Sequence, residues 1–335
     1  MFSKIVGNNL EYSFMLEKKW SLQIGGRILE IKTGLLAGQA NGAVTVRYGD
    51  TEVLATAVMS SEASHISGYF PLMVDFEERF YAAGKIKGSR FIKREGRPSD
   101  EAILSGRAVD RTIRPLFNHR MRNDVQVVIT VLSYDGENDP TAIAIIAASV
   151  ALSISDIPWK GPVAATRVGR LDGELILNPV NGELSEGNLD LLVSGGKNKI
   201  NMIECGAKEV SEEDILQSLA FAQEAINKIN NLIIQIKKEI GKEKAEPVLA
   251  QGTPEFESQI KEMLLSKGLA KALYDKDKKV IEKKVAEIKK EISNYIEETF
   301  TEEVEKLKEV SEIVFEETSD EIVHKNVIEK SLRPD

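Results

Sequence analysis

The sequence predicts an α+β fold followed by a small all-α domain. Short runs rich in β-branched residues alternate with turns over residues 10–60 and again over residues 163–204, a pattern typical of antiparallel sheets. A helix that is apolar on every side follows Asp139 and is therefore expected to be buried. From Pro254 onward the apolar spacing is helical. Because single cores stop growing near about 250–300 residues, a chain of 335 residues is expected to form two domains.

The first part of the chain is predicted to be a meander of strands separated by glycine-containing turns. The expected strands are Ser21–Ile24, Arg27–Ile31, Ala43–Tyr48 and Glu52–Met59. Further strands are expected at Val125–Ser133, Val163–Val168, Glu174–Leu177, Leu189–Ser194 and Ile200–Glu204. A long helix should begin at Ser211, and its apolar residues from Ile215 to Ile236 step by four and three, so one stripe packs on the sheet.

The domain boundary is predicted from a change in composition. Residues 241–253 mix Gly, Lys, Glu and Pro and are expected to form a linker. The first domain is then 1–240 and the all-α domain is 254–330. The chain from Gly241 onward carries a net charge of −6, which favours a positioning role over nucleic-acid binding.

Composition excludes several classes of protein. Apolar residues make up 42% of the chain, which excludes wholesale disorder. The single cysteine, Cys205, cannot form an internal disulfide, and this suits a reducing compartment. No apolar run approaches the roughly 20 residues that a membrane span requires. We therefore expect a cytoplasmic protein with no membrane partner.

Basic charge is concentrated between Arg79 and Arg122. This stretch holds twelve Lys or Arg against four Asp or Glu, a net charge of +8 in a chain whose formal charge is −9. Localised positive charge is the electrostatic footprint of a polyanion and predicts a nucleic-acid partner. The competing interpretation is a solvated surface on which the cations pair with neighbouring acids. The excess of cations favours the ligand.

The basic stretch divides into a loop and a helix. Glycines and Pro98 break regular structure, so residues 91–97 are expected to display their side chains. Ser99 can cap a helix that runs to Arg114. An exposed ring beside cations suits a single strand, because a base stacks on the ring while guanidinium groups hold phosphates. The candidate binding residues are Phe91, Lys93, Arg94, Arg97, Arg107, Arg111 and Arg114.

Motifs in and around this stretch resemble the polynucleotide phosphorylase family. They are Phe70-Pro71-Leu72, the run from Val74 to Ile86, the run from Phe91 to Ser99, and the run from Asp110 to Phe117. They are most similar to the first of the family's two RNase PH-type cores, and the resemblance continues through the helical domain. It implies that residues 1–240 form a core of mixed β-sheets packed with helices. The family's loop reads Phe-Phe-Arg-Arg, whereas this chain has Ile92 and Lys93 at the second and third of these positions. Any binding of RNA by this loop should therefore depend on Phe91 and Arg94.

The resemblance also implies where catalysis takes place. The family's active core has a serine-rich turn for the attacking phosphate, and two aspartates six residues apart with a lysine two residues after the second. Here the matching turn is residues 135–140, whose carboxylates would repel phosphate. The matching strand keeps Asp190 but has Leu184 and Leu192 at the other two positions. We expect no catalytic residue and no metal in this half; Mg²⁺ and inorganic phosphate would act in a second core.

Two functions follow as expectations. The first is the amino-terminal half of a phosphorolytic 3′-to-5′ exoribonuclease of mRNA degradation, which releases nucleoside diphosphates. The resemblance implies a homotrimeric ring, with single-stranded RNA and other RNA-degradation proteins as partners; residues 331–335 resemble the start of the segment that leads to the second core. The second is a stand-alone, non-catalytic RNA-binding or assembly module. A Ser-rich turn and paired aspartates encoded after Asp335 would support the first.

Overall fold

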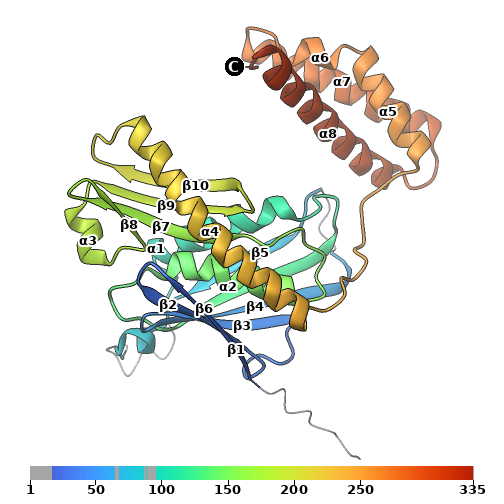
Figure 1. Ribbon diagram of the computed structural model, residues 1–335. Helices are drawn as coiled ribbons and strands as arrows, with labels where there is room; N and C mark the ends of the chain where they lie inside the picture. The colour runs from blue at the N-terminus through green and yellow to red at the C-terminus, as the bar shows by residue number, and fades with distance from the viewer. Residues whose placement is uncertain (1–16, 65–67, 87, 89–95, 335) are drawn as a thin grey trace, which may run out of the picture. The chain divides into compact units, whose positions relative to one another are not determined.

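The computed structural model describes residues 17–64, 68–86, 88 and 96–334, and these form two units (Figure 1). Unit 1 takes its described residues from Met1–Ser61, Leu72–Asn118 and Asp124–Glu246. Unit 2 takes its described residues from Glu62–Pro71, His119–Asn123 and Pro247–Asp335. The predicted α+β class is confirmed: unit 1 combines sheets and helices, and helices dominate unit 2.

A six-stranded sheet carries the first part of the chain. Its strands are β1 (Lys18–Ile24), β2 (Arg27–Thr33), β3 (Gly42–Tyr48), β4 (Thr51–Ala63), β5 (Leu72–Glu77) and β6 (Asn123–Ser133). Their order is β1-β2-β3-β4-β6-β5, so the predicted meander is present. The edge strand β5, which the sequence analysis did not predict, pairs in parallel with β6. Gly25 and Gly26 take positive φ in the turn between β1 and β2, where a side chain would strain the backbone.

A second, four-stranded antiparallel sheet completes the β-structure of unit 1. Its strands are β7 (Ala164–Leu171), β8 (Glu174–Leu177), β9 (Leu189–Gly196) and β10 (Lys199–Ala207). They lie in the order β10-β9-β7-β8. A short helix, α3 (Asn181–Glu186), connects β8 to β9.

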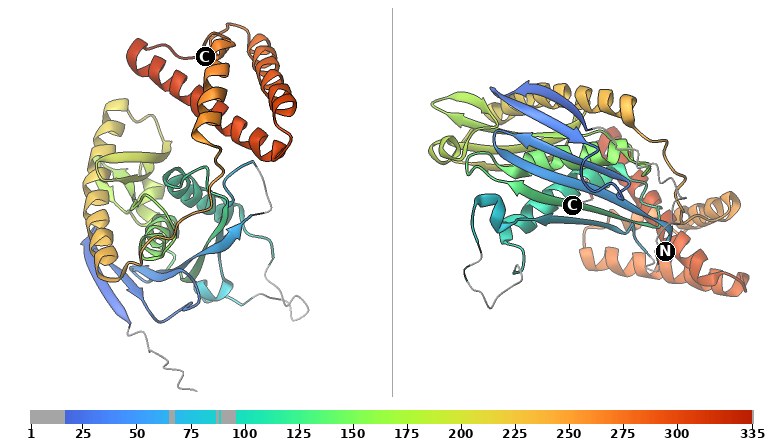
Figure 2. Two further views of the ribbon diagram at one scale, coloured as in Figure 1. Left: turned by 90° about the vertical axis from the view of Figure 1, so that its right-hand side faces the viewer. Right: turned by 90° about the horizontal axis from the view of Figure 1, so that it is seen from below.

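Three longer helices pack against these sheets. They are α1 (Asp100–Ile113), α2 (Pro140–Ile154) and α4 (Glu212–Ile240). Every residue of α2 from Thr141 to Ile154 is buried, as its all-apolar sequence predicts. The apolar stripe of α4 contacts α2, β7 and β9, and Figures 1 and 2 show α4 running along that layer. Two 3₁₀ turns, η1 (Phe80–Ala83) and η2 (Arg114–Leu116), flank α1 in the sequence.

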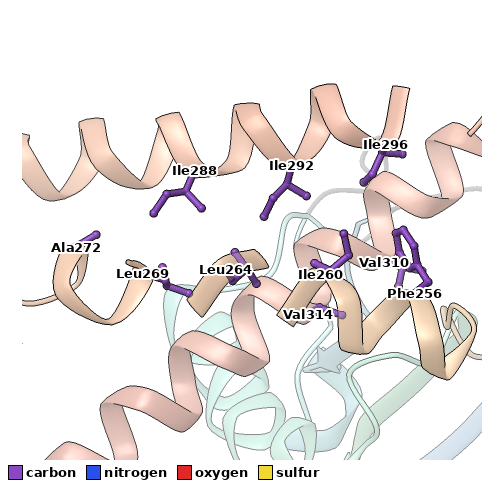
Figure 3. Packing of buried hydrophobic residues seen from close by; sticks show 10 residues of the cluster. All are labelled: Phe256, Ile260, Leu264, Leu269, Ala272, Ile288, Ile292, Ile296, Val310 and Val314. Carbon is purple, nitrogen blue, oxygen red and sulfur yellow. The ribbon is translucent and has the colours of Figure 1, made fainter. Parts of the chain in front are cut away.

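Unit 2 is built on four helices, α5 (Pro254–Ser266), α6 (Leu269–Ala272), α7 (Lys278–Thr299) and α8 (Val304–Lys330). Their apolar faces meet in one core, which Figure 3 shows with ten of its residues. Ile260, Leu264 and Ile296 are fully buried there. Each such side chain contributes about 1.5–3 kcal/mol relative to an exposed one, so the small bundle has a substantial core of its own.

The segment expected to be a linker, residues 241–253, is divided between the two units. Residues up to Glu246 belong to unit 1, where Lys242 N donates to Ile154 O (3.0 Å) and Ala245 N donates to Asp156 O (2.8 Å). Residues from Pro247 belong to unit 2, where Ala250 N donates to Arg120 O (2.8 Å). The segment therefore differs from a free linker, because protein groups satisfy these backbone donors.

None of the helices in the described part of the chain has the length and apolar composition of a membrane span.

Candidate nucleic-acid interface

The loop at the centre of the sequence prediction lies mostly outside the residues that the structure describes. Phe91, Lys93 and Arg94 lie outside the described residues. The described chain resumes at Gly96, and Arg97 directly after it is exposed. Its guanidinium has no hydrogen bond or ion pair within the described part of the chain. Arg97 is therefore available to an anionic ligand.

The helix that follows begins as the sequence predicts. Ser99 is the N-cap of α1, and its Oγ accepts a hydrogen bond from Ala102 N at 3.0 Å. Arg107 projects from this helix, is exposed, and has no side-chain partner among the residues described. It lines a groove of about 410 Å³ between α1 and the edge strand β5. The groove combines apolar groups, such as Met73, with charged ones, such as Asp75.

Two further arginines, Arg111 of α1 and Arg114 at its C-cap, already bind carboxylates. Arg114 donates to Asp110 through Nε (2.9 Å) and Nη2 (2.6 Å), and Nη2 also donates to Leu72 O at 3.0 Å. Arg111 forms an ion pair with Glu204 of β10. Both pairs are partly exposed, so each stabilises the fold only modestly. A phosphate would have to compete with these carboxylates for Arg111 and Arg114.

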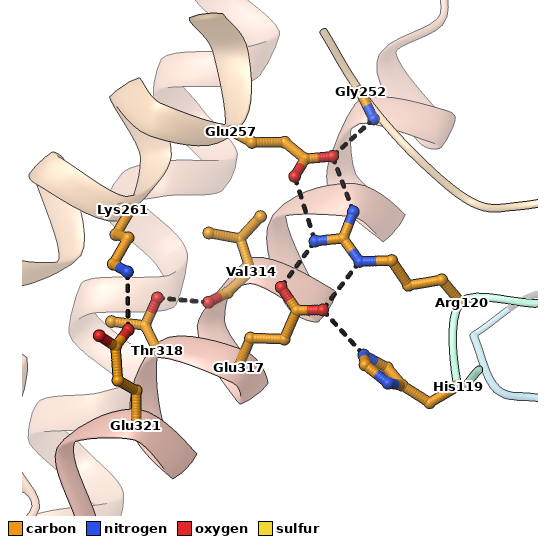
Figure 4. A network of polar contacts seen from close by, with 9 residues as sticks. All are labelled: His119, Arg120, Gly252, Glu257, Lys261, Val314, Glu317, Thr318 and Glu321. Carbon is orange, nitrogen blue, oxygen red and sulfur yellow. Dashed lines mark hydrogen bonds and ion pairs between the residues drawn. The ribbon is translucent and has the colours of Figure 1, made fainter. Parts of the chain in front are cut away.

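The last two cations of the basic stretch, Arg120 and Arg122, are structural residues of unit 2. Arg120 donates to Glu257 (Nη1–Oε1, 2.8 Å) and to Glu317 (Nη2–Oε2, 2.6 Å), as Figure 4 shows. The hydrogen bonds that Arg120 donates to Glu317 and Glu257 raise the pKa of Arg120 above its ordinary value. Arg122, whose side chain is 8% exposed, donates to Glu309 Oε1 at 2.7 Å. These two cations are not available to a nucleic acid.

The turn before α2 is acidic, and two of its carboxylates, those of Asp135 and Asp139, are engaged in hydrogen bonds. Asp135 Oδ1 accepts hydrogen bonds from the backbone N–H groups of Glu137 and Asn138, both at 2.8 Å, and from Thr51 Oγ1 at 2.9 Å. Burial opposes ionisation of Asp135, but these hydrogen bonds outweigh it and lower its pKa to about 2. These backbone and hydroxyl donors thus already bind a carboxylate.

Asp139 and Asp190 converge on one arginine. Arg167 of β7 donates to Asp190 through Nε (Oδ1, 2.6 Å) and Nη2 (Oδ2, 3.1 Å), which is the two-point geometry of a guanidinium on a carboxylate. Its Nη1 donates to Asp139 Oδ2. Burial lowers the pKa of Arg167, but the two carboxylates outweigh it and the net shift is upward. Three segments, the cap of α2, β7 and β9, are held together at this point.

Comparison with known proteins identifies the family. Domain 1 of the 3′ exoribonuclease family matches residues 25–158, and domain 2 of the same family matches residues 161–225. The chain belongs to the 3′ exoribonuclease family. The first match covers strands β2 to β6 of the six-stranded sheet with α1 and α2, and the second covers the four-stranded sheet and the start of α4.

Relatives within the family carry one name. The chain is 45% identical over 316 residues to a polyribonucleotide nucleotidyltransferase of Bacillus cytotoxicus, covering 94% of this chain and 44% of that protein. It is 44% identical to the one from Geobacillus kaustophilus (95% and 43% covered) and 42% identical to the one from Halothermothrix orenii (96% and 46% covered). The chain thus spans less than half the length of these relatives.

A solved structure supports the fold of this 3′ exoribonuclease domain pair. The crystal structure of rice (Oryza sativa) Rrp46 matches with a TM-score of 0.50 and 17% identity, covering 66% of this chain and 94% of that one. At this identity the match concerns the fold alone.

A divalent metal, which the family resemblance implies for an active core, does not fit the residues present here. The described residues contain no group of three or more His, Cys, Asp or Glu side chains able to hold a metal ion. Asp190, the aspartate that the sequence analysis matched to the active core, already forms two hydrogen bonds with Arg167. Asp190 is therefore not available to a metal ion in the part of the chain that the structure describes.

Sequence reasoning missed Arg167. It lies in a predicted strand, Val163–Val168, whose other members are Val, Ala or Thr. A single cation inside such a run was a signal, because a charge in a buried strand requires a charged partner.

Proposed function

We propose that the chain is the amino-terminal part of a polyribonucleotide nucleotidyltransferase, an enzyme that shortens RNA from its 3′ end with inorganic phosphate and releases nucleoside diphosphates. The observation that carries this proposal is 42–45% identity over 94–96% of the chain to proteins of that name. A cytoplasmic, ring-shaped homotrimer with Mg²⁺ and phosphate bound in a second core is part of the same proposal. This part of the enzyme would supply RNA-binding and assembly surface.

The RNA-binding role assigns different tasks to the candidate residues. Arg97 and Arg107 are exposed and unpaired within the described chain, so they would contact phosphates directly. Arg111 and Arg114 are paired with acids and would add positive potential near the same helix. Phe91 would stack on a base, with Lys93 and Arg94 on the adjoining phosphates.

The absence of a catalytic role rests on how the acidic groups are used. Asp135 accepts hydrogen bonds from backbone N–H groups and from a hydroxyl group, and Asp139 and Asp190 form ion pairs with Arg167. An attacking phosphate would find no free cluster of hydrogen-bond donors at this turn, and the carboxylates there would repel it. Unit 1 would therefore position RNA without reacting with it.

Phosphorolysis by the purified 335-residue chain tests the proposal. With poly(A), phosphate and Mg²⁺ or Mn²⁺, we expect no ADP above the blank, whereas single-stranded RNA should bind with an affinity that falls as salt rises. A polyribonucleotide nucleotidyltransferase of full length serves as the positive control for the assay. Phosphate-dependent ADP release that follows the chain through purification to homogeneity would overturn the non-catalytic role, and salt-independent or absent RNA binding would overturn the binding role.

A further inference from the structure

A short turn of unit 1 displays an exposed aromatic ring. The turn is η1 (Phe80–Ala83), and it lies at the periphery of unit 1, on the side away from α4 (Figures 1 and 2). Tyr81 in this turn is 58% exposed. Its ring has no aromatic or cation contact, and its hydroxyl no hydrogen bond, within the described part of the chain. The ring thus leaves in water an apolar surface that a stacked partner would bury.

Backbone hydrogen bonds hold this turn in one conformation. Ala82 N donates to Arg79 O and Gly84 N donates to Tyr81 O, both at 3.0 Å. Gly84 ends the turn with a positive φ of 66°, which a side chain would strain. Tyr134 N, directly after β6, donates to Ala82 O at 2.9 Å and attaches the turn to the six-stranded sheet. Because the backbone is already ordered, a ligand that stacks on the ring pays little additional entropy.

Two cations without a partner accompany the ring. Lys85 follows the turn, is exposed, and forms no ion pair or side-chain hydrogen bond with any residue that the structure describes. Arg97 is exposed and unpaired in the same sense. Ser99 Oγ donates to Glu78 Oε2 at 2.7 Å, so the segment that contains Arg97 lies beside the segment that leads into η1. The ring and the two cations therefore belong to one region of the surface.

The charge of this region favours an anionic partner. The ion pair of Glu77 with Arg79 neutralises both side chains. Glu78 keeps its charge, but Lys85 and Arg97 together outnumber it. Single-stranded nucleic acid uses both features, because a base stacks on the ring while the cations hold phosphates. An apolar protein segment would cover the ring and leave the two cations unused.

We infer that Tyr81 is a stacking platform for a base of single-stranded RNA, and that Lys85 and Arg97 hold the neighbouring phosphates. The inference rests on the proposed RNA-binding function and adds a ring that belongs to a fixed turn of unit 1. Since every base has a π face, the contact is tolerant of RNA sequence.

Binding of a fluorescent oligoadenylate by the full 335-residue chain tests the inference, with anisotropy as the readout. Tyr81→Ala should weaken binding about 5- to 150-fold, the loss of one stacked base, and leave the salt slope nearly unchanged. Tyr81→Phe keeps the ring and should bind within about twofold of the wild type. Lys85→Ala should instead reduce the slope by about 0.7. Tyr69→Ala is the matched control, because Tyr69 is also 58% exposed but belongs to unit 2, and it should bind like the wild type.

The outcomes separate this inference from the proposed function. A wild type that binds no RNA overturns both, whereas equal binding by the wild type and folded Tyr81→Ala overturns the inference alone. A loss in Tyr81→Phe or Tyr69→Ala as large as that in Tyr81→Ala also overturns it. A changed sedimentation coefficient of Tyr81→Ala at unchanged RNA affinity would make the ring an assembly contact instead.

Cross-linking of the wild type gives a measurement that needs no variant. A thiouridine-containing oligonucleotide is irradiated with the full chain, and the cross-linked peptides are identified by mass spectrometry. The peptide that contains Tyr81 should carry the nucleotide, and the yield should fall as salt rises. Cross-links confined to other peptides overturn the inference.

Discussion

Arg120 and Arg107 belong to the same basic stretch of sequence but have opposite environments. Arg120 is 16% exposed and binds the carboxylates of Glu257 and Glu317 inside unit 2. Arg107 is exposed on α1 in unit 1 and has no side-chain partner in the described chain. They lie thirteen positions apart in the sequence. Local charge density is the same for both, and only the fold distinguishes a structural cation from an available one.

The difference teaches how to interpret a cluster of basic residues. The acids that neutralise Arg120 lie 137 and 197 residues away in the sequence, so no local count can include them. The acid nearest to Arg107 in the sequence, Asp110, is instead paired with Arg114. A net charge of +8 over the stretch therefore overstates the positive charge that a ligand would meet.

The largest expected effect is on stability, when the ion pairs of Arg120 are removed. Arg120→Ala should lower the free energy of unfolding of unit 2 by about 3 kcal/mol, because it leaves two partly buried carboxylates unpaired. Arg107→Ala is the matched control and should change stability by less than about 0.5 kcal/mol. Denaturant unfolding followed by circular dichroism measures both. Equal stabilities of the two variants would contradict the structural role of Arg120.

The pH dependence of the Arg120 variant sharpens this test. Hydrogen bonds donated by the Arg120 guanidinium are the main cause that lowers the pKa of Glu317 below its ordinary value of 4.5. Electrostatic attraction to Arg120 and His119 lowers it further. A carboxyl with a depressed pKa in the folded state contributes stability above its unfolded pKa and loses it as pH falls through the folded pKa. The stability gap between wild type and Arg120→Ala should thus be full near pH 7 and narrow below about pH 4.5.

The next largest effect concerns the proposed stacking residue. Phe91→Ala should weaken single-stranded RNA binding by about 1–3 kcal/mol, the contribution of one base stacked on a ring, and leave the salt dependence nearly unchanged. Fluorescence anisotropy with a labelled oligonucleotide over a range of salt concentrations measures both quantities. A core position for Phe91 would instead lower stability by roughly 3–5 kcal/mol, so unfolding of Phe91→Ala would reject the displayed loop.

Local sequence rules predicted much of the fold. The strands of the meander, the cap of α1 at Ser99 and the buried helix α2 all follow from short-range patterns of turns, caps and apolar spacing. Edge strand β5 was missed, because its Leu72–Glu77 run contains one β-branched residue and two acids, and so lacks the β-branched richness of a central strand. The two halves of 241–253 were likewise missed as anchored segments, since their hydrogen bonds reach distant residues.

The candidate site was less predictable, because its chemistry depends on long-range pairs. Arg111 pairs with Glu204 and Arg167 pairs with Asp139 and Asp190, at separations from 23 to 93 residues. Spacing along the chain carries no information on such contacts. The acidic turn was expected to repel phosphate, and the structure adds that Asp135 itself takes up the available donors.

The smallest expected effect separates two arginines on the same helix. Arg107→Ala should reduce the slope of log affinity against log salt by about 0.7, which corresponds to one phosphate contact on a single strand. Arg111→Ala should change the slope by clearly less, because Glu204 already neutralises that guanidinium. Both positions are exposed, four residues apart on α1, and neither substitution should alter folding.

Removing the competing acid completes the comparison of the two arginines. Glu204→Gln frees the guanidinium of Arg111, so this variant should bind RNA more tightly and with a steeper salt slope than the wild type. Adding Arg111→Ala to Glu204→Gln should cancel that gain, since the freed cation is the source of it. Equal slopes for Arg107→Ala and Arg111→Ala, together with no gain from Glu204→Gln, would mean that ion pairing on α1 does not decide which arginine contacts phosphate, and that the basic face of α1 acts only through its summed potential.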